Sequence, residues 1–178
     1  MRPKAVLGFP LSLFLLVLIQ AVTATSSKDL CALPPAFRDG MSKQYPGTHI
    51  VTSVDLDEYD RKLFRKDHGT RCPGLVRVNF YGDGKPTGAF LLVSGENPKR
   101  KAELVVVRLI DSRWEARTLE TTDGTPVVWS EGPGKYDGIS DPKTIRAKYP
   151  VVVFCGYGSW TIVYAWTGKE VEKTWTSD

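Results

Sequence analysis

The strongest constraint on the fold is a change of hydrophobic periodicity near residue 74. From there to the C-terminus the spacing of apolar residues fits strands, and turns rich in glycine, aspartate and serine separate most of the runs. A period of two is typical of strands, and turns of two to four residues join such strands as antiparallel hairpins. Strands are predicted over residues 75–81, 87–94, 102–110, 114–120, 126–129, 145–147, 151–155, 160–166 and 170–176.

Helical spacing precedes this region. A helix is predicted from residue 35 to 45 because three apolar residues recur there at every fourth position. A short strand is predicted over residues 49–54, and a second helix follows, where Asp55 and Glu58 have the spacing of a capping box and Gly69 ends the helical pattern. Helices first and hairpins after predict an α+β fold. We expect one twisted antiparallel β-sheet, a meander of hairpins, with the two N-terminal helices packed on one face.

The first 24 residues have the pattern of a secretory signal peptide. Arg2 and Lys4 precede an apolar run over residues 5–22, and small residues lead to Ala24. Cleavage there leaves residues 25–178 as a single α+β domain, exported to the periplasm or the extracellular space. The alternative is an uncleaved anchor, which would make this segment the protein's contact with the membrane.

Charge gives no case for a nucleic-acid partner. Removing Arg2 and Lys4 from the 24 basic residues leaves 22 against 20 acidic residues, a net charge of +2. This near-balance argues against nucleic acid and against anionic membranes as partners. No Asn-x-Ser/Thr sequon occurs, which favours a bacterial exported protein.

The chain has three cysteines, Cys31, Cys72 and Cys155. Outside the cytosol two of them are expected to pair. Cys72 and Cys155 both stand at predicted strand ends, so a Cys72–Cys155 disulfide is predicted, with pairing of Cys31 and Cys72 as the alternative. A catalytic thiol needs a nearby base, and nothing in the sequence brings either histidine, His49 or His68, to a cysteine.

The segment from Asn79 to Thr87 has a partial resemblance to a calcium loop. Oxygen ligands at alternate positions and a glycine at the bend are the requirements of such a loop, and Asn79, Asp83 and Thr87 are the candidate ligands around Gly84. Asp83 is the single carboxylate, and calcium affinity rises with ligand charge. The prediction is therefore a hairpin turn, with no cofactor, and calcium as the alternative.

The stretch "VNFYGDGKPTGAFLLV", residues 78–93, resembles the FG-GAP/VCBS-type pattern, in which a turn of the Asn-Gly-Asp-Gly-Lys kind precedes an aspartate and an apolar strand. Tyr81 stands where the pattern has asparagine, and Thr87 or Gly88 stands where it has the aspartate. The chain is also similar to small exported bacterial proteins of unknown function that carry one such turn. The resemblance implies a fold and an exported location, and it implies no activity.

One predicted strand carries several large aromatic side chains on one face, in "GYGSWTIVYAW". Such a face is either the core under the helices, the ordinary arrangement for a sheet of this size, or an exposed platform for a glycan, peptide or protein. The candidate binding residues of the platform interpretation are Trp160, Tyr164, Trp166, Tyr157 and, from the glycine- and proline-rich loop over residues 130–143, Tyr136.

Two functions of different class follow. The first is a small, exported, non-enzymatic binding protein of the inhibitor or immunity kind, with an unknown protein or glycan partner in the cell envelope. The second is an envelope hydrolase using an acidic pair, either Asp55 with Glu58 or Asp123 with Glu131. The sequence has no Gly-x-Ser-x-Gly elbow, zinc-ligand spacing or phosphate loop.

Overall fold

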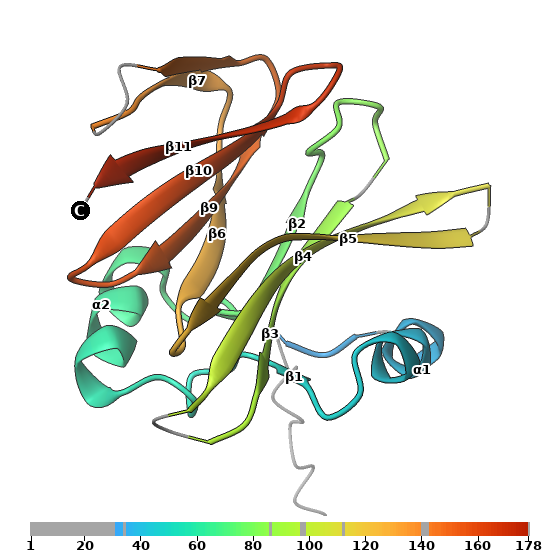
Figure 1. The fold of residues 1–178 in the computed structure, drawn as a ribbon, viewed down its shortest axis with the longest axis vertical. Coiled ribbons are helices and arrows are strands. Elements are labelled where there is room, and N and C mark those ends of the chain that lie inside the picture. The colour runs from blue at the N-terminus through green and yellow to red at the C-terminus, as the bar shows by residue number, and fades with distance from the viewer. Residues whose placement is uncertain are drawn as a thin grey trace, which may run out of the picture.

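The structure is a computed structural model that describes residues 31–33, 35–85, 87–96, 99–111, 113–139 and 143–177. The predicted signal peptide lies outside these residues. Within them, two helices and eleven strands form three antiparallel sheets (Figure 1). The α+β class and the antiparallel pairing are confirmed. The prediction of a single sheet is wrong, because the strands divide into two packed sheets and a small ribbon.

Sheet A has five strands in the order β1-β3-β4-β5, with β2 also paired to β3 on the side of β1. Its strands are β1 His49–Ile50, β2 Leu75–Val78, β3 Thr87–Ser94, β4 Lys101–Ile110 and β5 Arg113–Asp123. The prediction for β3 is confirmed to the residue. The predicted strand over residues 49–54 is reduced to His49–Ile50, since the chain turns away after Val51.

Sheet B has four strands in the order β11-β10-β9-β6, and a separate ribbon pairs β7 with β8. The strands are β6 Val127–Glu131, β7 Gly134–Asp137, β8 Thr144–Ala147, β9 Val151–Gly156, β10 Trp160–Trp166 and β11 Val171–Ser177. The segment predicted as one long loop therefore contains β7. Its sequence, GKYD, has no apolar alternation, and pairing with β8 is what makes it a strand.

The main core lies between sheets A and B. Sheet A contributes alternate residues of β3 and β4, such as Leu91 and Leu104, and sheet B contributes Val152, Phe154 and Tyr164. A second cluster under the ribbon covers the opposite face of sheet B through Ile145 and Ala147. Because β9 and β10 are covered on both faces, their sequences read as nearly continuous apolar runs.

The two helices do not share a face, which corrects the predicted placement. Helix α1 (Pro35–Gln44) packs Phe37 and Met41 on the outer face of sheet A, away from the main core. Helix α2 (Glu58–His68) inserts Phe64 into the main core, and His68 contacts Trp129 of β6. Figure 1 shows the two helices on different sides of the body. No helix in the described part of the chain is long and apolar enough to span a membrane.

Asp57, not Asp55, caps helix α2. Its carboxylate accepts the backbone N–H of Asp60 at 2.8 Å. The predicted capping role of Asp55 is therefore wrong, and that carboxylate instead organises the loop that leads from β1 to α2.

Candidate functional site

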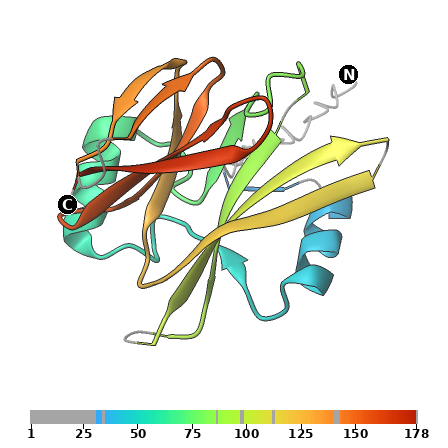
Figure 2. The same ribbon diagram turned by 45° about the horizontal axis from the view of Figure 1, so that its top comes forward.

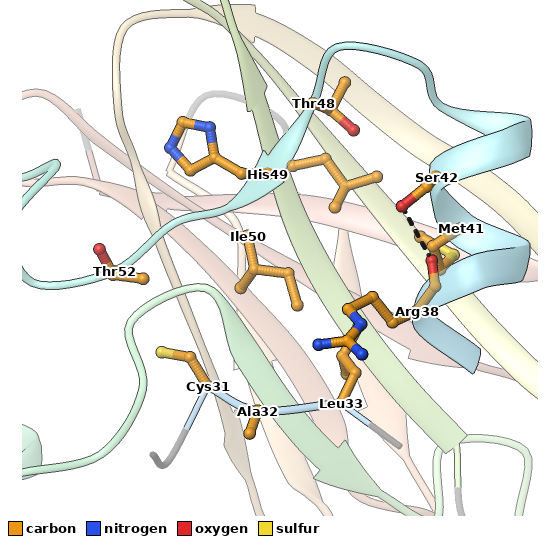
Figure 3. Close-up of a pocket in the computed structure, with 11 residues that line it drawn as sticks. Cys31, Ala32, Leu33, Arg38, Met41, Ser42, Thr48, His49, Ile50 and Thr52 are labelled. Atoms are coloured by element: carbon orange, nitrogen blue, oxygen red, sulfur yellow. Dashed lines mark hydrogen bonds between the residues drawn. The ribbon is translucent and has the colours of Figure 1, made fainter. Parts of the chain in front are cut away.

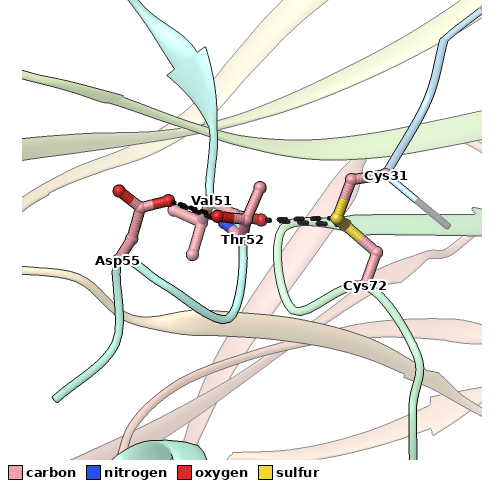
Figure 4. The surroundings of a disulfide bond; sticks show 5 residues. All are labelled: Cys31, Val51, Thr52, Asp55 and Cys72. Atoms are coloured by element: carbon pink, nitrogen blue, oxygen red, sulfur yellow. Dashed lines mark hydrogen bonds between the residues drawn. A yellow bond between two sulfur atoms is a disulfide. The ribbon is translucent and has the colours of Figure 1, made fainter. Parts of the chain in front are cut away.

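The disulfide joins Cys31 to Cys72 (Figure 4). The predicted Cys72–Cys155 bond is wrong, and Cys155 is a buried thiol that accepts the hydroxyl of Thr161. The prediction assumed that the strands next to Cys72 and Cys155 are neighbours. They lie in different sheets, since β2 pairs with β3 and β9 pairs with β6 and β10. A disulfide is typical of proteins that fold in an oxidising compartment.

Three adjoining cavities lie around the disulfide and the segment that follows Cys31. The first has a volume of about 350 Å³ and lies between α1 and β1 (Figure 3). The second, about 440 Å³, lies beside α2 and shares Cys31 and Thr52 with the first. The third, about 320 Å³, lies on the outer face of sheet A and shares Leu33 with the first. We call the three together the arginine groove.

The basic side chains that line the arginine groove are five arginines and His49. The arginines are Arg38, Arg61, Arg65, Arg71 and Arg77, and no aspartate or glutamate of the described chain joins them in the lining.

Arg61 has a structural role, because its guanidinium donates to the carbonyls of Ser53 and Leu56. The other four are exposed, and within the described residues none forms an ion pair.

Arg38 lies beside the first cavity. Figure 3 shows its side chain reaching from α1 across the first cavity toward Ile50, above Leu33. The hydroxyl proton of Ser42, which lines the same cavity, is already donated to the Arg38 carbonyl at 3.0 Å.

The third cavity has an aromatic wall. The rings of Phe37 and Phe90 stack with centroids 5.0 Å apart, and Trp114 meets Phe37 edge-on at 4.6 Å. Trp114 is 53% exposed. Gly88 makes the wall possible, because a Cβ at this position would overlap the Phe90 ring. The cavity thus combines an exposed indole, buried phenyl rings and the guanidinium of Arg77.

His49 and Asp55 form a pair at the edge of the first cavity. His49 Nε2 lies 2.9 Å from the Asp55 carboxylate, which also accepts the backbone N–H and the hydroxyl of Thr52, at 2.8 and 2.9 Å. Arg100 lies 3.5 Å from the same carboxylate. Burial raises the pKa of Asp55, but the hydrogen bonds from His49 and Thr52 outweigh burial and hold that pKa below its usual value. Asp55 is therefore a structural anion.

Three of the four carboxylates of the hydrolase hypothesis, those of Asp55, Glu58 and Glu131, have other partners. Asp55 is held as described, and the exposed Glu58 pairs with Lys62 at 2.7 Å. Asp123 is the last residue of β5 and Glu131 is the last residue of β6. The extended strand β6 therefore separates these two carboxylates along the chain. Glu131 accepts the indole N–H of Trp129 at 3.1 Å.

The aromatic face of β10 belongs largely to the core. Tyr164 is 2% exposed, out of reach of a ligand, and Trp160 and Trp166 are half-buried against the same core. Tyr157 is also half-buried against the core, and Tyr136 lies in the ribbon, where its hydroxyl donates to the Gly132 carbonyl at 2.6 Å. The structure does not bring these five aromatic residues together on one exposed surface.

Two of the three candidate oxygens of the calcium alternative are used by the turn itself. Asn79 Oδ1 accepts the N–H of Gly84 at 3.2 Å, and Asp83 Oδ1 accepts the N–H of Lys85 at 2.9 Å. Thr87 is buried in sheet A. Among the residues that the structure describes, no three histidine, cysteine, aspartate or glutamate side chains are grouped so that they could hold a metal ion.

Sequence reasoning missed the arginine groove. Its residues come from the segment after Cys31, helices α1 and α2, the loops before and after α2, and strands β1 to β5, so no local pattern joins them. The available signal was the tryptophan near the start of β5, a residue type that is enriched among interface hot spots. Comparisons with protein families, with curated proteins and with solved structures find no match for this chain.

Proposed function

We propose that the protein is an exported, non-enzymatic binding protein, and that its arginine groove binds a segment of a partner protein in which carboxylates alternate with apolar side chains. The observation that supports this proposal is the set of four exposed arginines, Arg38, Arg65, Arg71 and Arg77, without ion-pair partners in the described chain, beside an apolar cavity wall.

The chemistry of the lining favours this ligand class. A guanidinium donates two parallel hydrogen bonds to a carboxylate, and arginine and tryptophan are the residues most enriched among interface hot spots. The wall formed by Phe37, Phe90 and Trp114 offers apolar contact next to Arg77. An acidic, partly apolar segment would satisfy both features.

Export is part of the same proposal. The signal-peptide pattern of residues 1–24 and the disulfide both fit an oxidising compartment outside the cytosol. A binding role of the inhibitor or immunity kind fits a chain whose candidate catalytic carboxylates, Asp55 and Glu58, are engaged by His49 and Lys62.

The test uses the exported product purified from cells that express the full chain. Three peptides share the same leucine positions and differ only in their polar positions, which are all glutamate, all glutamine or all lysine. We expect the glutamate peptide to bind best and the lysine peptide not to bind in fluorescence titrations. Arg38→Glu with Arg77→Glu should weaken binding of the glutamate peptide by about tenfold or more, since charge-assisted hydrogen bonds are lost.

Arg146→Glu is the matched control, because Arg146 is an exposed arginine on β8 for which the described residues provide no ion pair, and β8 covers the outer face of sheet B. Equal affinity for the three peptides would refute the proposal. The same follows if Arg146→Glu weakens binding as much as the groove variants do. Binding of a sulfated glycan in preference to the glutamate peptide would assign the groove to a glycan instead.

A further inference from the structure

We infer that two copies of this chain associate by antiparallel pairing of their β5 strands, with Glu115 of one copy opposite Arg117 of the other. This inference does not rest on the proposed ligand, because neither of these two charged residues lines the arginine groove, although pairing would cover part of Trp114, which does.

Strand β5 is a long free edge. It spans Arg113–Asp123, and in the described chain its pairing partner is β4 alone. The β4–β5 hairpin extends beyond the body of the molecule, where it is drawn in yellow (Figure 2). Near its tip the outer face carries two exposed apolar side chains, Leu109 at 40% and Trp114 at 53%, which are opposite each other in the ladder. Long free edges with exposed apolar side chains are sites of strand addition.

The ladder shows which backbone groups of β5 are free. Ile110 and Arg113 close a two-residue turn, so they form a hydrogen-bonded pair, and bonded and non-bonded pairs alternate from there. Glu115 and Arg117 thus direct their N–H and C=O groups to β4. Trp114, Ala116 and Thr118 direct theirs to the free edge.

The charges and the length of β5 together select one register of self-pairing. A two-fold axis through Ala116 places Glu115 opposite Arg117 of the second copy, and it does so twice. Trp114 then lies opposite Thr118 of the second copy. A two-fold axis through Glu115 would place that carboxylate opposite its own copy and Arg113 opposite Arg117. An axis through Arg117 would oppose two arginines. A two-fold axis through Trp114 would also place Arg113 opposite Glu115 of the second copy, but only residues 113–115 of the strand could pair in that register. Opposite charges directly across a ladder stabilise it and like charges destabilise it.

The side chains at this centre suit close approach. Ala116 is small enough to face its own copy across the axis. Arg117 is exposed and forms no ion pair within the described residues, and Glu115 contacts Arg108 through one carboxylate oxygen at 3.3 Å, which leaves the other oxygen available. Pairing would therefore satisfy the free backbone groups, form two ion pairs and reduce the exposure of Trp114.

Sedimentation of the exported product over a range of concentrations tests the inference. We expect a dimer whose dissociation constant rises about tenfold or more in Glu115→Arg and in Arg117→Glu, because each variant places like charges opposite each other twice. Mixing the two variants should restore the dimer as a heterodimer, since one chain then carries two positive and the other two negative charges at these positions. Restoration by mixing also shows that both variants are folded.

Ala116→Cys gives a second readout. A residue on the two-fold axis faces its own copy across a hydrogen-bonded pair, where Cα atoms lie about 5.5 Å apart, within disulfide range. We expect this variant to form a disulfide-linked dimer on mild oxidation, and Thr122→Cys, on the same strand but away from the axis, not to form one. If the unmodified protein sediments as a monomer at all concentrations, the inference is overturned. A dimer insensitive to both charge variants overturns it as well, because its interface must then lie elsewhere.

Discussion

The hydroxyl of Tyr164 donates a hydrogen bond of 2.9 Å to the carboxylate of Glu120 and thereby joins the two sheets. Tyr164 belongs to β10 of sheet B and Glu120 to β5 of sheet A. Lys173 of β11 contacts the same carboxylate oxygen. The three groups form a polar link at the edge of an otherwise apolar sandwich core.

Removing the tyrosine hydroxyl should weaken this link. In Tyr164→Phe the ring still fills its place in the core, but Glu120 loses a donor while it keeps Lys173. We expect a loss of about 2 kcal/mol in the free energy of unfolding, the range for a hydrogen bond to a charged group. Urea denaturation measures it. Tyr59→Phe is the control, since Tyr59 is 64% exposed on α2 and should change nothing. Equal stability of both variants would contradict a stabilising role for the Tyr164–Glu120 bond.

The same carboxylate predicts a pH dependence of stability. Burial raises the pKa of Glu120, but the hydrogen bonds from Lys173 and Tyr164 outweigh burial and lower the pKa below its ordinary value of 4.5. The unfolded chain then binds the proton more readily than the folded chain. The stabilising contribution is therefore complete above pH 4.5 and is lost as the pH falls through the lowered pKa of the folded state.

Thermal unfolding measured between pH 7 and pH 3 checks this sign. We expect the melting temperature to fall below pH 4.5, and to fall less steeply in Glu120→Gln, which cannot titrate. Asp55→Asn serves as a comparison, because the pKa of Asp55 is also lowered and that variant should remove a different part of the slope. An unchanged slope in Glu120→Gln would show that Glu120 has the same pKa in both states.

Reduction of the Cys31–Cys72 disulfide should destabilise the protein. The bond closes a loop with a sequence separation of 41 residues, and the chain-entropy account assigns such a loop about 4 kcal/mol. We expect a lower denaturation midpoint in reducing agent and in Cys72→Ser. Cys155→Ser should lower the midpoint less, because Cys155 closes no loop and a serine there can still accept the hydroxyl of Thr161. Thiol titration of the unfolded, unreduced protein should find one thiol, at Cys155. Modification of Cys72 in that experiment would refute the observed pairing.

The local elements were largely predictable from the sequence, and their assembly was not. Residues 160–166 have the composition of a strand, and the structure places β10 there without change. The same alternation cannot say whether consecutive strands continue one sheet or cross to another. The division into two sheets therefore had no local signal, and the error in pairing Cys72 with Cys155 followed from it. The arginine groove was missed for the same reason, because the tertiary fold alone brings Arg38, Arg77 and Trp114 to one groove.

Calcium should not stabilise the protein. The oxygens of Asn79 and Asp83 already accept N–H groups of their own turn, and Thr87 is buried in β3. A cation would have to displace these bonds with a single carboxylate in compensation. We expect no shift in melting temperature between millimolar calcium and a chelator. A calcium-dependent rise that Asp83→Asn removes would contradict this expectation and restore the loop as a metal site.

Two glycines should respond to alanine in opposite directions. The carbonyl of Gly74 accepts the N–H of Leu91 at 2.8 Å. The carbonyl of Leu91 accepts the N–H of Val51 at 2.9 Å, so the three segments approach one another closely here. A Cβ at Gly74 would overlap the backbone of Val51, which cannot move aside without losing the bond to Leu91. We expect Gly74→Ala to lower the free energy of unfolding by about 1–3 kcal/mol, the cost of overpacking.

Gly40 lies inside α1 with open space where a Cβ would be placed. Alanine there reduces the backbone entropy of the unfolded chain and favours the helix, so we expect Gly40→Ala to raise the free energy of unfolding by about 0.5–1 kcal/mol. Urea denaturation of both variants under the same conditions shows whether each substitution lowers or raises the free energy of unfolding. A neutral Gly74→Ala would show that the loop before β2 can move away from Val51. That result would weaken the placement of the second cavity, because Cys72 and Thr52 adjoin this contact and line that cavity.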